Sequence, residues 1–217
     1  MTNKIKIGLT LIPMQLILMY ISIVILLRYT TNPVILQIGN FLPTVLVFIM
    51  ALFLFKDRLI NDWKRLDIAK WKLIVISIIG VIIIQVIFNI INMLSVTSDN
   101  NLDAIYIPFS ELSALDKSLF IFFSLASVLS GLTEELYFRY LFLKKIFVKH
   151  KFIGLVASSI LFGLAHYFVE YSFESTIGYM IVGLVFGFIY LKTDNIWYTA
   201  SIHMLNNFCF SILVVFI

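Results

Sequence analysis

The sequence predicts an all-α, polytopic membrane protein of about seven transmembrane helices, from its composition and from the spacing of its apolar runs. Of the 217 residues, 61% are hydrophobic and only 13% are charged. A soluble domain has about 45–50% apolar and about 25% charged residues, so a soluble globular fold is excluded. The net charge of +4 is small and is divided by apolar runs. We therefore expect the lipid bilayer as a partner and no nucleic acid.

Seven apolar runs follow one another along the chain. Each is long enough, or nearly long enough, to cross about 30 Å of hydrocarbon as a helix. The first follows Lys4 and Lys6 and has no small-residue cleavage site, so we expect an uncleaved signal anchor. The fourth run is interrupted by charged residues, and the last three runs are short. The predicted spans are 7–27, 29–55, 73–98, 118–143, 152–169, 175–191 and 195–217.

The basic residues between these runs predict the orientation of the chain in the membrane. Thirteen Lys and Arg residues flank one side, two flank the other, and Arg139 lies within a span. By the positive-inside rule, the N-terminus is expected in the cytoplasm and the C-terminus outside. The Ile-, Phe-, Lys- and Asn-rich composition is typical of an AT-rich bacterial genome, so we expect the chain in a bacterial plasma membrane. Residues 1–117 are expected to form three helices with a basic cytoplasmic loop and an acidic outer loop at 96–117.

The fourth span carries Glu134, Glu135 and Arg139, which are unusual inside a membrane. Each charge costs roughly 2.5–3.5 kcal/mol at the middle of a span, so three unpaired charges would cost about 8–10 kcal/mol. Glu135 and Arg139 are four residues apart with the acid first, which favours an ion pair on one helix face. Glu134 is rotated from them by about 100° around the axis. Its carboxylate therefore remains available for chemistry or for a partner on another helix.

Three polar side chains on later spans are candidate partners of Glu134. His166 lies on the fifth span, and His203 and Asn207 lie four residues apart on the seventh. Glu134 and His166 are both 16 residues from His150 in the intervening turn, which places them level, about 24 Å along antiparallel helices. Each such group alone is also typical of an interhelical hydrogen bond, and a Glu–Arg pair can be purely structural. Polar groups at compatible depth on three spans favour a shared site.

Three motifs in the second half of the chain resemble those of a known family. The segments EELYFR, FGLAH and HMLNN fit the patterns EExxxR, FxxxH and HxxxN, in this order and on the corresponding helices. They are similar to the CPBP family of membrane proteases, which contains CAAX proteases and bacteriocin-processing enzymes and is also called the Abi family. The resemblance covers residues 118–217, which are therefore expected to form the protease core, with the catalytic groups in the last four helices.

The resemblance implies a role for each motif residue. Glu134 would activate a water molecule for attack on a peptide carbonyl, assisted by His166. His203 and Asn207 would stabilise the oxyanion, since an imidazole N–H and an amide are suitable donors in a water-poor site. The residues expected to support this site structurally are Glu135, Arg139 and Phe162.

A zinc site is the open alternative, because the family has also been described as metalloproteases. Glu134, His166 and His203 form an acceptable three-ligand set for zinc. With Glu134 bound to a metal and the neighbouring glutamate paired with arginine, no carboxylate would remain as the general base, which HExxH enzymes supply separately. Asn207 would also have no evident role. We therefore favour a metal-free mechanism without a cofactor.

The sequence thus predicts an intramembrane endopeptidase that hydrolyses a peptide bond in a membrane-associated peptide or protein. The resemblance implies bacteriocin or signalling-peptide maturation, self-immunity, or CAAX-type processing, the last of which requires a prenylated substrate. The alternative is a non-catalytic membrane immunity or regulatory protein that binds a peptide in the same polar cavity. A transporter is less favoured, because the intramembrane charges are confined to one half of the chain. No oligomeric state is indicated.

Overall fold

The computed structural model describes residues 2–94, 112–170 and 172–212, and all regular structure in these ranges is helical. This confirms the predicted all-α fold. The ends of the third and seventh predicted spans and most of the acidic loop 96–117 lie outside the described residues. The elements are α1 (Asn3–Leu26), α2 (Pro33–Leu36), α3 (Ile38–Lys64), α4 (Lys70–Leu94), α5 (Ala114–Glu135), the π-helix η3 (Leu136–Ile146), α6 (Lys151–Glu170), α7 (Phe173–Thr193) and α8 (Ile196–Ser211).

Every predicted span corresponds to one helix or to two consecutive helices. α2 and α3 together form the second span, and α5 continues directly into η3. Within the described ranges, five units are long and apolar enough to cross a membrane, namely α1, α2–α3, α4, α5–η3 and α7. α6 contributes a shorter apolar helix, and α8 has 16 residues. The protein is therefore a polytopic membrane protein in which two of the predicted spans are short helices.

Local sequence signals set several helix ends. Asn32 caps α2, because its side-chain oxygen accepts a hydrogen bond of 2.9 Å from a backbone N–H two residues on, and Pro33 occupies the first helical position. Ser172 and Asn195 cap α7 and α8 in the same way. Asp194 has a φ of 47°, a left-handed conformation that ends α7. This residue allows a short turn into α8.

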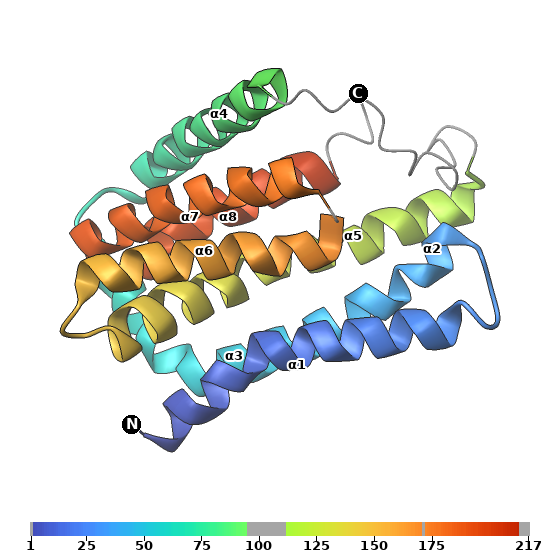
Figure 1. Cartoon of the computed structure of the whole chain (residues 1–217), viewed down its shortest axis with the longest axis horizontal. Helices are drawn as coiled ribbons and strands as arrows, with labels where there is room; N and C mark the ends of the chain where they lie inside the picture. Colours follow the sequence, from blue (N-terminus) through green and yellow to red (C-terminus); the bar gives the residue numbers. More distant parts are fainter. Residues whose placement is uncertain (1, 95–111, 171, 213–217) are drawn as a thin grey trace.

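Figure 1 shows α1 and α3 along one side of the bundle and α4 along the other. α5 packs against α8, α6 against α7, and α4 against both α7 and α8. The N-terminus, the α3–α4 connection and the η3–α6 connection gather at one end of the bundle, and α5 begins at the other end (Figure 1). The N-terminal helices therefore flank the predicted catalytic helices on two sides.

Glycine allows α6 and α7 to approach closely. A Cβ atom on Gly183 of α7 would lie 3.0 Å from the Ser159 Cα atom of α6. Backbone atoms cannot move aside as a side chain can, so this contact requires a small residue. The close approach also brings the ring of Tyr179 on α7 against the ring of His166 on α6, with centroids 3.7 Å apart.

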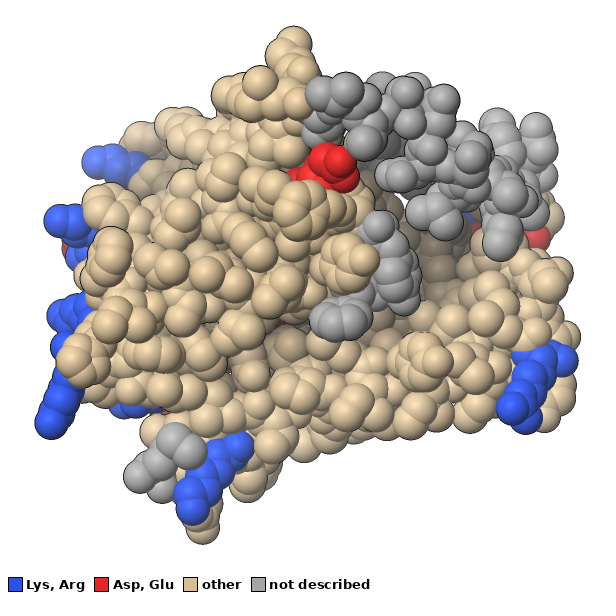
Figure 2. Space-filling model, in the orientation of Figure 1, with Lys and Arg blue, Asp and Glu red and all other residues tan. Residues whose placement is uncertain are grey.

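The outward faces of the helices carry large apolar side chains. Ile17 of α1, Phe53 of α3, Ile82 of α4 and Phe188 of α7 are all more than half exposed. Most of the Lys and Arg side chains visible in Figure 2 gather at the end of the bundle that holds the N-terminus. A surface with an apolar band and a basic end suits a chain inserted in a bilayer.

An ionic cluster lies at this basic end, where the sequence predicts a basic cytoplasmic loop. Asp62 of α3 is fully buried and pairs with Arg58 at 2.8 Å and with Arg65. Its carboxylate also accepts a hydrogen bond of 3.2 Å from the first backbone N–H of α8, and its carbonyl oxygen accepts one of 2.7 Å from the Asn195 side chain. The predicted basic loop is therefore partly helical, because α3 continues to Lys64 and packs against the α7–α8 turn.

Candidate active site

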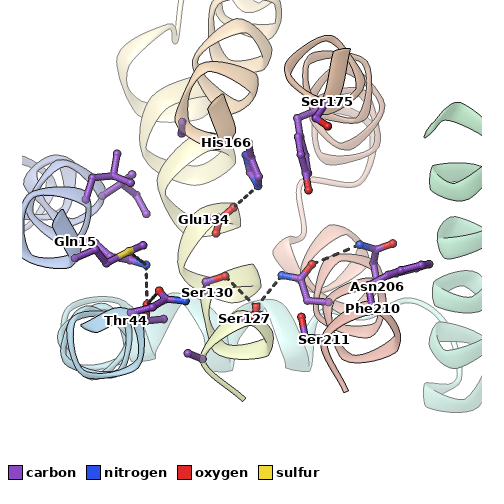
Figure 3. A pocket seen from close by; sticks show the side chains of 18 of the residues that line it. Gln15, Thr44, Ser127, Ser130, Glu134, His166, Ser175, Asn206, Phe210 and Ser211 are labelled. Atoms are coloured by element: carbon purple, nitrogen blue, oxygen red, sulfur yellow. Dashed lines mark hydrogen bonds and ion pairs between the residues drawn. The ribbon is translucent and has the colours of Figure 1, made fainter. Parts of the chain in front are cut away.

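The end of α5 and the start of η3 hold the acidic motif. Glu134 and Glu135 are the last two residues of α5. The ion pair expected from the four-residue spacing is formed, with 3.2 Å between Glu135 Oε2 and Arg139 Nε, and both side chains are fully buried. Glu134 lies on another face of the helix and lines a cavity (Figure 3). The π-helix that follows was not predicted, and π segments are frequent at functional sites.

Arg139 is held by a hydroxyl group and two aromatic rings. Its Nη1 donates a hydrogen bond of 3.0 Å to Ser158 Oγ, which in turn donates one of 3.0 Å to the Phe138 carbonyl oxygen. The guanidinium carbon lies 4.9 Å from the centre of the Phe162 ring and 5.8 Å from that of Phe186. Cation–π contacts are strongest away from water, so these rings stabilise the buried charge. The motif residue Phe162 therefore supports the site through Arg139.

Glu134, His166 and His203 come together from three helices. The Glu134 Oε2 atom lies 3.7 Å from His166 Nε2 and 3.8 Å from His203 Nε2. A direct N–H···O hydrogen bond measures about 2.7–3.2 Å, so the three groups surround a small space rather than bond to one another. The Oε2 atom is buried, and no hydrogen-bond partner reaches it within the part of the chain that the structure describes. Figure 3 shows the His166 ring directed at Glu134.

The other ring nitrogen of each histidine faces a different acceptor. His166 Nδ1 lies 2.8 Å from the Phe162 carbonyl oxygen, and because a carbonyl only accepts, this nitrogen carries the proton. His203 Nδ1 lies 3.3 Å from Glu135 Oε1, whose carboxylate is ion-paired. With its proton on Nδ1, the neutral His166 ring has an acceptor at Nε2. This nitrogen and the Glu134 Oε2 atom are two acceptors 3.7 Å apart, which suits a molecule with two donors, such as water.

Aromatic rings fix the orientation of both imidazoles. Tyr179 stacks on His166 with 19° between the ring planes. Phe162 and Phe186 lie 5.7 and 5.5 Å from the His203 ring centre. Tyr179 belongs to no motif, and an aromatic residue in an apolar span gives no sequence signal of such a contact. The structure therefore adds it to the residues that position His166.

Asn207 lines the cavity and is bonded to α5. Its Nδ2 donates a hydrogen bond of 2.7 Å to the Ser127 carbonyl oxygen, and its Oδ1 accepts one of 3.5 Å from Asn206. Ser127 is seven residues before Glu134. The hydrogen bond of Asn207 to α5 is therefore about two helical turns from Glu134, along the same face of the helix. As an oxyanion donor, Asn207 would use the second hydrogen of its amide.

The cavity has a volume of about 510 Å³ and is lined by residues of all the long helices. Glu134 is the only acidic or basic residue in its described lining apart from His166. Uncharged polar side chains supply much of the remaining wall, among them Gln15, Thr44, Gln85, Ser127, Ser130 and Asn206. The first two belong to α1 and α3, helices that carry no motif and were not expected to contribute to the site.

The cavity reaches toward the end of the bundle opposite the basic connections. Its lining includes Asn92 near the end of α4, Ser175 near the start of α7 and Ser211 at the end of α8. These three helix ends lie on one side, because consecutive long helices run antiparallel. His203 is only 4% exposed and approaches Glu134 from the bundle core.

The alternative zinc ligands are slightly farther apart than the ligands of a tetrahedral zinc ion. Neighbouring ligands of a tetrahedral zinc ion are about 3.3 Å apart when each is about 2.0 Å from the metal. Glu134 lies 3.7 and 3.8 Å from the nitrogens of His166 and His203. No group of three His, Cys, Asp or Glu residues in the described ranges is arranged to hold a metal ion. The zinc alternative therefore stays a prediction.

Comparison with known proteins finds a family model that matches part of the chain. Residues 116–209 match the family model Rce1-like, described as type II CAAX prenyl endopeptidase Rce1-like. The matched segment begins near the start of α5 and ends within α8, so it contains all three motifs. No curated protein and no solved structure shows a significant match to the chain.

Proposed function

Because residues 116–209 match the Rce1-like family model of type II CAAX prenyl endopeptidases, we propose that the chain hydrolyses peptide bonds with Glu134 as the general base. One observation carries this proposal. The Glu134 Oε2 atom is buried between two imidazole nitrogens, and no described residue gives it a hydrogen bond. A carboxylate held beside two imidazoles in a polar cavity is positioned to accept a proton from a bound water molecule.

The reaction begins with proton transfer from water. Glu134 takes one proton, and the resulting hydroxide attacks the carbon of the scissile carbonyl. His166, whose Nδ1 proton is held by a backbone carbonyl, accepts a hydrogen bond from the same water at Nε2 and orients it. Protonated Glu134 then gives its proton to the leaving amine. One water is consumed, one peptide bond breaks and the carboxylate is regenerated.

His203 is suited to oxyanion stabilisation. Its Nδ1–H points at the Glu135 carboxylate at 3.3 Å, a partner that suits a ring donating from both nitrogens. The Nε2–H of such a ring donates to the oxyanion, together with the second amide hydrogen of Asn207. The two histidines thus differ in function because one faces a neutral carbonyl and the other a carboxylate.

The substrate we propose is a membrane-associated peptide or protein of a bacterial plasma membrane. With the basic connections in the cytoplasm, the cavity reaches toward the outer side of the membrane. This direction supports the maturation of an exported peptide, such as a bacteriocin or a signalling peptide, or self-immunity against one. CAAX-type processing would instead require a prenylated substrate.

Glu134→Gln tests the proposed general base. Glutamine keeps the size of the side chain but cannot take up the proton, so cleavage should fall by about 10²–10⁴-fold. The measurement is incubation of the purified protein with candidate peptides, followed by mass spectrometry to locate the cut. Asp57→Asn, an exposed carboxylate of α3, is the matched control and should cleave as the wild type does. Unchanged cleavage in Glu134→Gln would overturn the proposal, whereas peptide binding without any cleavage by the wild type would favour the non-catalytic alternative.

Metal removal tests the absence of zinc from the mechanism. Exhaustive chelation of the purified protein should leave the cleavage rate unchanged, because the proposed steps use only protein groups and water. Activity that disappears on chelation and returns with zinc alone would instead assign Glu134, His166 and His203 as metal ligands.

A further inference from the structure

A second buried polar atom without a hydrogen-bond partner among the described residues belongs to a residue that lines the same cavity, on a helix that no motif marks. From it we infer a substrate-binding subsite at Gln15, in which the side-chain Oε1 atom accepts a hydrogen bond from a backbone N–H of an uncharged, unmodified peptide segment. The inference rests on the proposed function and states how the cavity recognises its substrate. Figure 3 shows Gln15 on a different wall of the cavity from His166.

The orientation of the Gln15 amide is set by a chain of hydrogen bonds between α1 and α3. Gln15 is only 7% exposed. Its Nε2 donates a hydrogen bond of 3.0 Å to Thr44 Oγ1, and Thr44 in turn donates one of 3.2 Å to Asn40 Oδ1. Each bond fixes the direction of the next, so the Nε2 atom is the donor and the Oε1 atom is the acceptor.

The Oε1 atom is then left without a donor. It is buried, and no described residue forms a hydrogen bond with it. A buried acceptor without a partner destabilises the folded chain. A glutamine that served only to join α1 to α3 would need the Nε2 bond alone. Gln15 lines the cavity, so we infer that the missing donor is an N–H group of a molecule bound there.

The rest of the cavity wall indicates the chemistry of that molecule. Amides and hydroxyls such as Gln85, Ser130 and Asn206 are interleaved with apolar side chains such as Phe88 and Phe210. Amide and hydroxyl groups can form hydrogen bonds with the N–H and C=O groups of a peptide backbone. Main-chain hydrogen bonds of this kind also hold a peptide that binds to the edge of a β-sheet. An aspartate would be buried here beside Glu134, a group of the same charge, and a prenyl chain would leave the polar wall unpaired. The wall therefore favours a peptide segment with small or apolar side chains.

The subsite belongs to a part of the chain that the family match does not cover. Gln15 and Thr44 lie in α1 and α3, outside the matched residues 116–209. The three motifs alone therefore do not include the proposed substrate contact. The N-terminal helices would adapt one catalytic centre to the particular peptide that this chain cleaves.

Peptide binding to an inactive protein tests the subsite separately from cleavage. The Glu134→Gln protein is titrated with end-blocked ten-residue peptides of Ala, Gly, Ser, Val and Leu. The tightest of these peptides is then methylated at one backbone nitrogen at a time. We expect one methylated position to weaken binding by about tenfold, because it removes the N–H that Gln15 accepts.

Gln15→Leu identifies which hydrogen bond was lost. Leucine matches glutamine in size and is compatible with an apolar helix, so the variant should fold. On the Glu134→Gln background, it should weaken binding of the unmethylated peptide by about tenfold. Methylation at the sensitive position should then cause no further loss of affinity. Ile17→Val, on the exposed face of the same helix, is the control and should change neither value.

The outcomes separate the two proposals. The subsite would be overturned if Gln15→Leu and each methylation weakened binding independently, so that their effects added for every peptide. It would also be overturned if no uncharged peptide bound. Tighter binding of matched peptides that contain lysine, aspartate or farnesylated cysteine would overturn the assigned peptide class. If the methylation pattern holds but wild-type cleavage does not depend on Glu134, the subsite stands and the proposed catalytic mechanism fails.

Discussion

Glu135 and Arg139 form an ion pair whose two side chains are fully buried. Such a pair contributes little net stability, because removing both charges from water opposes their attraction. The pair instead orients the side chains around it. Glu135 also faces His203 Nδ1, and Arg139 also donates to Ser158, so one pair connects α5, η3, α6 and α8. At the scale of single residues, the site therefore depends on a charge pair that does not itself touch the cavity.

Arg139→Met tests this dependence. The variant leaves Glu135 charged and unpaired in the core, so we expect the free energy of unfolding to fall by about 3–5 kcal/mol. Denaturant unfolding in detergent, followed by the fluorescence of the 3 tryptophans, measures the change. Glu135→Gln/Arg139→Met should be less destabilised than Arg139→Met, and Arg28→Met, an exposed arginine, should match the wild type. An Arg139→Met protein as stable as the wild type would contradict a structural role for the pair.

The sequence predicts the local contacts of these residues better than the distant ones. Glu135 and Arg139 lie four residues apart, so helix geometry alone specifies their pairing. The meeting of Glu134 with two histidines could be expected from depth along the spans. Gln15 and Tyr179 could not be expected, because their contacts depend on how α1 and α7 are rotated about their axes.

At the scale of helices, the packing of α6 against α7 controls the position of His166. Two glycines of α7 face α6, but they meet different obstacles. A methyl group at Gly183 would lie 3.0 Å from the Ser159 backbone, whereas one at Gly187 would meet the end of the Leu155 side chain. A side-chain end can rotate away, and a backbone atom cannot. The two positions therefore form a matched pair for mutation.

We expect Gly183→Ala to be the more harmful of the two substitutions. Overpacking at a rigid contact costs about 1–3 kcal/mol, and a shift of α6 would move His166 away from Glu134. Thermal unfolding and the cleavage rate should both fall in Gly183→Ala and change less in Gly187→Ala. Equal effects of the two substitutions would show that the backbone contact does not control the site.

The apolar runs predict where helices lie more accurately than where they end. α3 continues past Lys56 and Arg58 to Lys64, although charged residues close the predicted span. Long basic side chains can bury their stems and keep their charges at the interface, so a helix can extend through them. The π-helix η3 also has no signal in the sequence pattern, since its residues are those of an ordinary apolar span.

At the scale of the whole molecule, Asp194 joins helices that are distant in the sequence. It pairs with Lys144 of η3 and, at 3.5 Å, with Arg58 of α3. Partial burial opposes its charge, but the neighbouring Lys144 and Arg58 charges outweigh burial and hold the pKa of Asp194 below its ordinary value. At the basic end of the bundle, Asp194 on the α7–α8 turn thus links η3 and α3 through ion pairs.

Asp194→Asn should destabilise the protein only above acidic pH. A carboxylate whose pKa is lower in the folded chain stabilises the fold above its unfolded value of about 3.9, and this contribution is lost as the pH falls through the folded pKa. Asparagine tolerates the left-handed backbone at this position. Because the Asp194 side chain is 51% exposed, the expected loss at pH 7 is below about 1 kcal/mol.

Melting temperatures of the wild type and Asp194→Asn, compared at neutral pH and at about pH 2–3, check this expectation. The two proteins should differ at neutral pH and converge in acid. A difference of the same size at both values would assign the effect to the turn rather than to the charge.

The buried carboxylate oxygen of Glu134 is needed for the proposed catalysis but lowers the stability of the folded protein. Any apolar or amide side chain at this position would relieve the strain of an unsatisfied group, in the way that active-site residues often limit robustness. A screen that ranks variants by yield or by heat resistance alone would therefore enrich inactive proteins. Engineering of this chain would have to select for turnover in the same round.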